Sequence, residues 1–155
     1  MAHVDNPWVK TVTQDSFQSD VLETSKTVPV LVDFWATWCG PCKASFPGMK
    51  KAVEHYSSDK DVVFLFVDTW ENKENLEPRV SGFIRDNSYP FHVLLDSENK
   101  VVTDYKIGGI PTKYVIGPDQ KVRFVSIGFN GSTDELLEEM KIMIEMARGG
   151  SIVRS

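Results

Sequence analysis

The sequence predicts an α/β domain, and three observations carry that prediction. Two nearly continuous apolar runs, residues 28–35 and 61–68, have the composition of strands buried on both faces of a sheet. The stretch between them carries apolar residues at helical spacing, which makes a strand–helix–strand unit with an expected right-handed crossover. A hairpin and a final helix follow. With 155 residues, 41% of them hydrophobic, the chain is long enough for one core without covalent cross-links.

In the first half of the chain, strands and helices alternate. Thr13 or Asp15 is suited to cap a first helix, which should bury Phe17 and Val21. Pro47 falls within the next helix and is expected to kink it, since proline removes a backbone hydrogen bond. The expected elements are a strand at 8–13, a helix to about Thr24, a strand at 28–35, a helix that buries Phe46, Met49, Val53 and Tyr56, and a strand at 61–68.

In the second half, the pattern predicts helices around a hairpin. Residues 100–107 permit a strand or a short helix, of which we favour the helix. Gly117-Pro118-Asp119-Gln120 is a turn signal between two short strands and predicts an antiparallel hairpin. The expected elements are a helix at 71–87 with Pro78 near its start, a strand at 90–95, a helix at 100–107, strands at 112–116 and 122–127, and a last helix capped by Ser132 or Thr133 that buries Leu136, Met140, Met143 and Ala147.

Charge and composition argue against several classes of protein. A net charge of −5 disfavours nucleic acid as the main partner, and no apolar run approaches the roughly 18 residues of a membrane-spanning helix. The first residues, MAHVDN, lack the basic and apolar regions of a signal peptide, although such a start also suits a domain excised from a longer precursor. One domain is expected over residues 1–155, with its core at about 8–147 and flexible tails at 1–7 and 149–155.

Both cysteines of the chain lie in one pentapeptide, Trp38-Cys39-Gly40-Pro41-Cys42. A disulfide across so small a loop stabilises a fold little, because the entropic gain grows with loop length. Cys39 follows a strand and begins a helix, where unpaired backbone N–H groups favour a thiolate. Pro41 suits the first helical turn, where its missing N–H is no loss. Cys42, one turn further in, should be more buried and act as the resolving thiol.

Two other roles for the cysteine pair are weaker. A structural zinc site needs about four ligands, and the only histidines, His3, His55 and His92, have no metal-binding spacing. An inert structural disulfide is the second alternative. A CxxC beside a strand–helix–strand unit favours redox chemistry.

Two segments resemble thioredoxin. Residues 30–43, VLVDFWATWCGPCK, resemble its active-site segment, and Ile110-Pro111-Thr112 resembles the cis-proline loop that faces the cysteines in that superfamily. The resemblance implies a thioredoxin fold, a central mixed β-sheet flanked by helices, with an extra helix and strand around residues 71–95. It also implies that the Ile110–Pro111 bond is cis, with the backbone before Pro111 free to pair with an extended substrate.

The extra helix and strand, together with CKASFP at residues 42–47, are similar to the TlpA/ResA-like thiol–disulfide oxidoreductases. The similarity covers most of residues 8–147. Ser45 departs from the pattern, since ResA-like reductases often carry an acidic residue there. An account of substrate recognition built on that acid is therefore not carried over.

Asp33 matches the buried acid of thioredoxin. An aspartate within an apolar strand is costly unless it is partnered or protonated, so burial should raise its pKa and suit it to accept a proton from Cys42. The alternative is an aspartate that turns to solvent at the strand's end. Thioredoxin places a lysine near this acid, on the strand that corresponds to residues 62–68. Only apolar residues precede Asp68 there, so Asp33 is expected to be more strongly perturbed.

The sequence also suggests positions for several residues near the motif. Trp38 is expected to form an apolar rim that docks substrate, and Trp35 to pack beneath the site. Lys43 either adds positive potential or is simply solvated. The acidic residues Glu71, Glu74 and Glu77 are expected on a solvated helix face.

The resemblance implies a protein-disulfide reductase that acts by mixed-disulfide exchange, since Gly40-Pro41 is typical of reducing members. Cys39 would attack, Cys42 would resolve the intermediate with help from Asp33, and Trp38, Gly40, Pro41, Ile110 and Pro111 would contact substrate. No cofactor or metal is expected. Expected partners are protein or small-molecule disulfides and an upstream thiol reductant, and the protein is expected to be a monomer.

Two alternative functions and one alternative location stay open. A disulfide oxidase or isomerase uses the same cysteines, and a non-catalytic binding module or metallochaperone would use them to hold a partner or a metal. The resemblance implies the bacterial cell envelope or periplasm, with the cytoplasm as the alternative.

Overall fold

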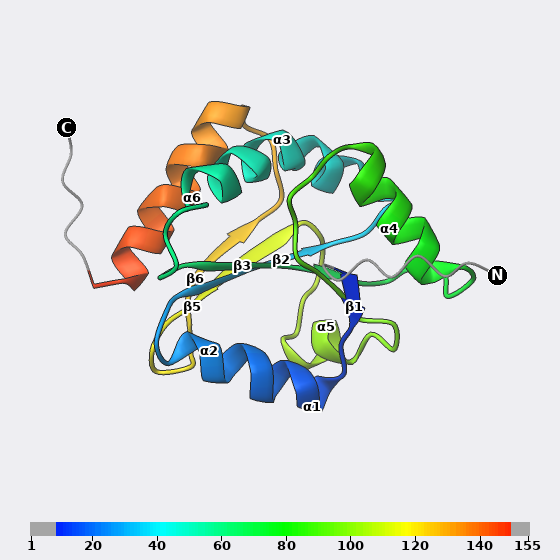
Figure 1. Cartoon of the computed structure of the whole chain (residues 1–155), viewed down its shortest axis with the longest axis horizontal. Helices are drawn as coiled ribbons and strands as arrows, with labels where there is room; N and C mark the ends of the chain where they lie inside the picture. Colours follow the sequence, from blue (N-terminus) through cyan, green and yellow to red (C-terminus); the bar gives the residue numbers. More distant parts are fainter. Residues whose placement is uncertain (1–8, 150–155) are drawn as a thin grey trace.

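A six-stranded mixed sheet runs through residues 9–149, the part of the chain that the computed structural model describes (Figure 1). The strand order is β1-β4-β3-β2-β5-β6, with β1 to β4 mutually parallel and β5 antiparallel to both β2 and β6. The strands are β1 Val9–Thr11, β2 Val30–Trp35, β3 Val63–Asp68, β4 Val93–Leu95, β5 Thr112–Ile116 and β6 Val122–Ile127.

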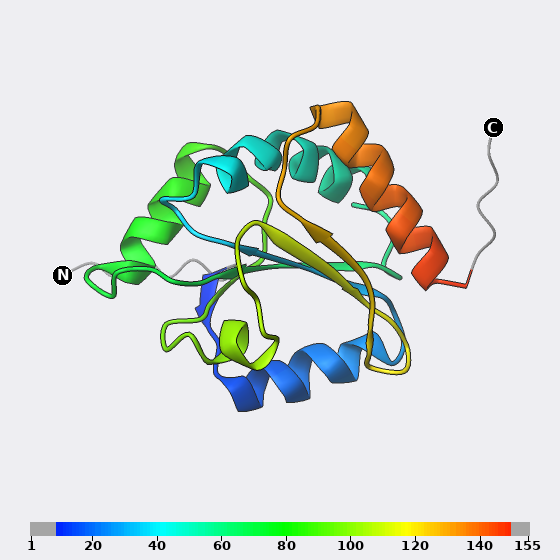
Figure 2. The ribbon, with the colours of Figure 1, turned by 180° about the vertical axis from the view of Figure 1, so that it is seen from behind.

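Helices cover both faces of this sheet (Figures 1 and 2). On one face lie α3 Gly40–His55, α4 Leu76–Asp86 and α6 Thr133–Ala147; on the other lie α1 Gln14–Phe17, the π-helical turn η1 Gln18–Leu22, α2 Glu23–Ser25 and α5 Lys100–Asp104. Each face therefore has its own hydrophobic core. The predicted α/β class and thioredoxin fold are confirmed.

The central position of β2 in the sheet explains why its sequence is an almost uninterrupted apolar run. All six residues of β2 are buried, because β3 and β5 flank it in the sheet and helices cover both of its faces. The hairpin of β5 and β6 is confirmed, and so is the helix at 100–107, as α5. The strand expected at 8–13 is present as β1, although Trp8 and the predicted tails, apart from Gly149, lie outside the described residues.

The predicted helix caps are present at both ends of the fold. Thr13 Oγ1 accepts a hydrogen bond from the backbone N–H of Ser16 at 3.1 Å, ahead of a helical stretch that buries Phe17. Ser132 caps α6 in a reciprocal arrangement with Glu135. Pro47 lies inside α3 on its exposed side, and the kink expected there stays a prediction.

The helix expected at 71–87 begins later than predicted. Only α4, from Leu76, is helical, because Asn75 immediately before it takes a left-handed conformation with φ 52°. The preceding residues form a connection from which the Glu71 side chain and the Trp70 carbonyl bind residues of the redox turn. Pro78 falls in the first turn of α4, where it was expected. In residues 9–149, no helix has the length and apolar character needed to cross a membrane.

Candidate active site

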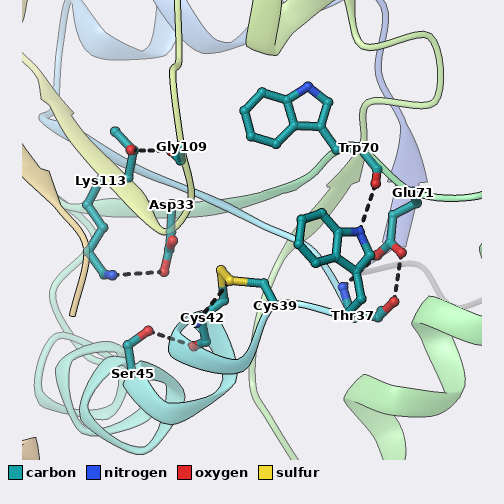
Figure 3. The surroundings of a disulfide bond; sticks show 11 residues. Asp33, Thr37, Cys39, Cys42, Ser45, Trp70, Glu71, Gly109 and Lys113 are labelled. Atoms are coloured by element: carbon teal, nitrogen blue, oxygen red, sulfur yellow. Dashed lines mark hydrogen bonds and ion pairs between the residues drawn. A yellow bond between two sulfur atoms is a disulfide. The ribbon is translucent and has the colours of Figure 1, made fainter. Parts of the chain in front are cut away.

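The cysteine motif lies at the carboxyl end of β2, where the chain turns into α3 (Figure 3). Cys39 is the N-cap of that helix and Cys42 lies in its first turn, with Pro41 between them. The two cysteines form a disulfide. The backbone N–H of Cys42 donates to Cys39 Sγ at 3.2 Å. The helix terminus therefore directs an N–H donor at the sulfur that was predicted to act as nucleophile.

Exposure differs sharply across the motif. Trp38 is 60% exposed, and Gly40 and Pro41 are exposed beside it. Both cysteines are buried, Cys42 more completely, as expected for the resolving thiol. The motif thus presents an aromatic rim to solvent with the disulfide set just below it.

The proline loop lies at the same end of the sheet as the motif. Because β5 is antiparallel to β2 and pairs Thr112 with Phe34, the residues before β5 lie where β2 ends. The Ile110–Pro111 bond is cis, as predicted. Pro111 is buried and its carbonyl accepts a hydrogen bond from Gly128 N–H at 2.8 Å, while Ile110 is half-buried and packs against the core that contains both cysteines.

Asp33 is fully buried in β2 and has a lysine directly across the sheet. Lys113 of β5 is its cross-strand partner, and Lys113 Nζ lies 3.8 Å from Asp33 Oδ2. Lys113 is only 1% exposed. Among residues 9–149, neither carboxylate oxygen of Asp33 has a hydrogen-bond partner. In Figure 3 the Asp33 carboxylate lies between the Lys113 ammonium and the disulfide.

This pair corrects one sequence-based expectation and supports another. Burial raises the pKa of Asp33 to about 6, and the positive charge of Lys113 limits the rise. The alternative of a solvent-facing aspartate is wrong. The strand β3 supplies no lysine, as expected, but β5 does, so the stronger perturbation of Asp33 expected from a missing lysine no longer follows.

A second polar cluster lies behind the motif, around Glu71. The expectation that this residue lies on a solvated helix face is wrong, since its side chain is 3% exposed. Glu71 Oε2 accepts from Thr37 N–H and Glu71 Oε1 from Thr37 Oγ1, both at 2.7 Å. Arg79 Nη1 lies 3.0 Å from Glu71 Oε1. Glu74 is exposed, as predicted, but precedes α4 instead of lying on it, and Glu77 lies on α4 but is half-buried.

Asp68, at the end of β3, is the third buried carboxyl near the motif. Burial, reinforced by the neighbouring Glu71, raises its pKa to about 10. Burial also opposes ionisation of Glu71, yet its contacts with Asp68, Thr37 and Arg79 together hold its pKa below the ordinary value. At neutral pH the cluster therefore contains one carboxylate, on Glu71, one neutral carboxyl, on Asp68, and the cation of Arg79.

A profile of the AhpC/TSA family matches residues 9–125, which includes the motif, Asp33, the acidic cluster and the proline loop. The chain belongs to the AhpC/TSA family. Thiol-disulfide oxidoreductase ResA of Bacillus subtilis is 34% identical to it over 99 residues, a match that covers 64% of this chain and 52% of that protein. This AhpC/TSA chain thus spans about half the length of that relative.

Two solved structures extend the comparison. StoA from Bacillus subtilis superposes with a TM-score of 0.62 and 26% identity, over 74% of this chain and 83% of that one. The exposed lipoprotein thioredoxin of Streptococcus pneumoniae superposes with a TM-score of 0.63 and 27% identity, over 78% and 89% of the two chains.

Lys113, Asp68 and Glu71 were not predicted as site residues, and Glu71 was expected in solvent. Lys113 lies two residues before the core residue Val115 in a strand, so it falls on the same buried face. Asp68 ends an apolar run much as Asp33 interrupts one. Both signals were present in this AhpC/TSA sequence, whereas nothing local marked Glu71 as buried. In residues 9–149, no group of three or more Cys, His, Asp or Glu is arranged to hold a metal ion.

Replacing Asp68 by asparagine should stabilise the protein increasingly as pH rises. The folded state keeps a proton on Asp68 that the unfolded chain releases above about pH 4. The wild-type free energy of unfolding should therefore fall by about 1.4 kcal/mol per pH unit from this group, over pH 4 to 7. Asp68→Asn lacks that loss. Urea denaturation of both oxidised proteins at pH 5 and pH 7 measures the difference, and parallel pH dependence in the two proteins would refute the assignment.

Proposed function

We propose that this protein is a thiol–disulfide oxidoreductase that reduces disulfides in other molecules. The observation that carries the proposal is the Cys39–Cys42 disulfide at the N-terminal end of α3, with the buried Asp33 beside it. A scaffold disulfide has no need of a titratable group below it. The names of the relatives, thiol-disulfide oxidoreductase and thioredoxin, support the same chemistry.

The reaction proceeds by two exchanges. The Cys39 thiolate attacks one sulfur of the substrate disulfide, forms a mixed disulfide and expels the other substrate sulfur as a thiolate. Asp33 then accepts the proton of the Cys42 thiol, and the Cys42 sulfur attacks Cys39 Sγ. The second substrate sulfur leaves as a thiolate. Two electrons pass to the substrate, and the protein is left with the Cys39–Cys42 disulfide.

The neighbouring residues give this chemistry its orientation. The N–H of Cys42 stabilises the Cys39 thiolate in the dithiol form of the protein, before the thiolate attacks substrate. The exposed Trp38, Gly40 and Pro41 form the surface against which a substrate lies. The backbone of Ile110, next to the buried Pro111, pairs with an extended substrate segment. The chemistry needs no bound cofactor, because the electrons are carried by the two cysteines.

The partners follow from the same chemistry. The protein acts on protein or small-molecule disulfides, works as a monomer and is returned to the dithiol form by an upstream thiol reductant. We place it in the bacterial cell envelope, a location supported by the relative from Streptococcus pneumoniae that is described as an exposed lipoprotein. The cytoplasm is the alternative.

The reduction potential tests the direction of the reaction. Equilibration with glutathione buffers of known ratio, followed by quantitation of the free thiols of Cys39 and Cys42, gives the potential directly. We expect a value near −270 mV, the thioredoxin value, which a reductant requires. A value of about −120 to −180 mV would instead identify an oxidase or isomerase and would overturn the proposed direction.

A further inference from the structure

Two consecutive residues from the connection between β3 and α4 hold two consecutive residues of the redox turn. Glu71 accepts hydrogen bonds from both the N–H and the hydroxyl of Thr37, each at 2.7 Å. The carbonyl of Trp70 accepts a hydrogen bond from the indole N–H of Trp38 at 2.8 Å. Thr37 and Trp38 lead directly into Cys39, so these bonds fix the chain immediately before the nucleophile. We call Trp70 and Glu71 the clamp.

The clamp is itself held in a conformation that costs free energy. Trp70 has φ 54°, in the left-handed region that bulky side chains rarely occupy. Asn99, in the connection between β4 and α5, stabilises this conformation because its Oδ1 accepts a hydrogen bond from the Trp70 N–H at 2.9 Å. Backbone strain of this kind persists where the surroundings enforce it and is concentrated at functional sites.

Within the clamp, the negative charge is carried by Glu71. Asp68 is neutral at pH 7, as its raised pKa indicates, so it can accompany the Glu71 carboxylate without repulsion. Arg79 supplies the counter-charge and also donates to Thr37 Oγ1 at 3.1 Å. Thr37 therefore makes charge-assisted hydrogen bonds, which are roughly twice as strong as neutral ones.

The clamp leaves the Trp38 indole both immobilised and exposed. Its N–H is used internally, and 60% of the residue stays accessible to solvent. A partner can then contact the apolar ring without the loss of conformational entropy that ordering a mobile side chain would require. An ordered aromatic residue is a strong anchor at protein interfaces. A small disulfide reaches the cysteines without needing this surface, whereas a protein disulfide must lie across it.

We propose that Glu71 is a positioning residue: by holding Thr37, it fixes the exposed Trp38 indole beside Cys39 and thereby raises the affinity for protein disulfides over small ones, a role that rests on the proposed reduction of disulfides. Glu71 does not touch the reacting sulfurs. Its effect reaches substrate through the orientation of Trp38.

The test compares Glu71→Gln with Glu74→Gln, a matched loss of charge at an exposed position of the same connection. Steady-state kinetics use insulin and oxidised glutathione as substrates, with dithiothreitol as the reductant. We expect Glu71→Gln to raise the KM for insulin about five- to tenfold, the loss of one charge-assisted hydrogen bond. Its kcat/KM for oxidised glutathione should change by less than about twofold, and Glu74→Gln should affect neither substrate.

Two variants of Thr37 test the same contact without removing the buried charge of Glu71. Thr37→Ser keeps the hydroxyl that donates to Glu71 and should retain the wild-type KM for insulin, whereas Thr37→Val replaces that hydroxyl with a methyl group and should raise the KM. In two-dimensional ¹H–¹⁵N NMR spectra of the folded proteins, the Thr37 amide and Trp38 indole resonances should move in Glu71→Gln and stay in place in Glu74→Gln.

An equal loss of activity toward insulin and glutathione in Glu71→Gln would show a merely structural role and overturn the inference. Unchanged kinetics or unmoved Thr37 and Trp38 resonances would overturn it too. Wild-type protein that reduces neither substrate would instead refute the proposed function, so the two failures are distinguishable.

Discussion

Replacing Cys39 by serine should abolish disulfide reduction. A serine hydroxyl is not ionised at neutral pH and cannot form the mixed disulfide, so the whole covalent route is lost. We expect the rate of insulin reduction to fall by several orders of magnitude, to the rate of the reductant alone, as removal of a nucleophile does in other enzymes with covalent intermediates. The insulin precipitation assay with dithiothreitol measures this loss. Full activity in Cys39→Ser would refute the mechanism.

Cys42→Ser should fail at a different step. Cys39 can still attack, but no neighbouring thiol resolves the intermediate, so the mixed disulfide with substrate should accumulate. The mass of this species should exceed that of the free variant by the mass of the attached substrate, and it should return to the mass of the free variant on addition of dithiothreitol. We assign the attack to Cys39 because Cys42 is fully buried and Cys39 is the helix N-cap. The opposite assignment of the two thiols predicts that Cys39→Ser traps the substrate instead. The pair of variants therefore decides which sulfur attacks.

The second large effect concerns the buried pair of Asp33 and Lys113. When Cys39 is loaded with thionitrobenzoate, attack by Cys42 releases a coloured thiolate, and the release rate reports the step that Asp33 assists. In the wild type this rate should rise as Asp33 ionises, at about pH 6. Asp33→Asn should lose that rise and slow release at pH 8 by about a hundredfold, the low end of the effect of a general base.

Lys113→Met separates the lysine's electrostatic effect from the base itself. Without the ammonium that limits the rise, the pKa of Asp33 should lie above 6, so the rise in release rate should move to higher pH. At pH values below both the wild-type and the new pKa, each unit of displacement should slow release about tenfold, because a tenth as much carboxylate is present. Lys121→Met, at an exposed position in the β5–β6 turn, is the matched control and should keep the wild-type profile. A Lys113→Met profile identical to that of Lys121→Met would contradict the role of the pair.

Most of the fold could be predicted because its signals are local. The run of apolar residues in β2, the helical spacing after it and the turn at residues 117–120 each depend on neighbours in the chain. The start of α4 could not be predicted in this way. Residues 71–75 contain good helix formers, but Glu71 gains more by accepting hydrogen bonds from Thr37 and Arg79 than it would on a solvated helix face.

The residues of the redox motif could be recognised from the chain alone. The two cysteines, their spacing and the aspartate within the preceding strand are adjacent enough in the chain that a strand followed by a helix brings them together. The residues that surround them come from distant parts of the chain and could not be predicted. Lys113 faces Asp33 through the register of β2 and β5, about 80 residues apart in the chain, and Glu71 reaches Thr37 across 34. Pairings at that separation depend on sheet order and burial, which local patterns do not specify.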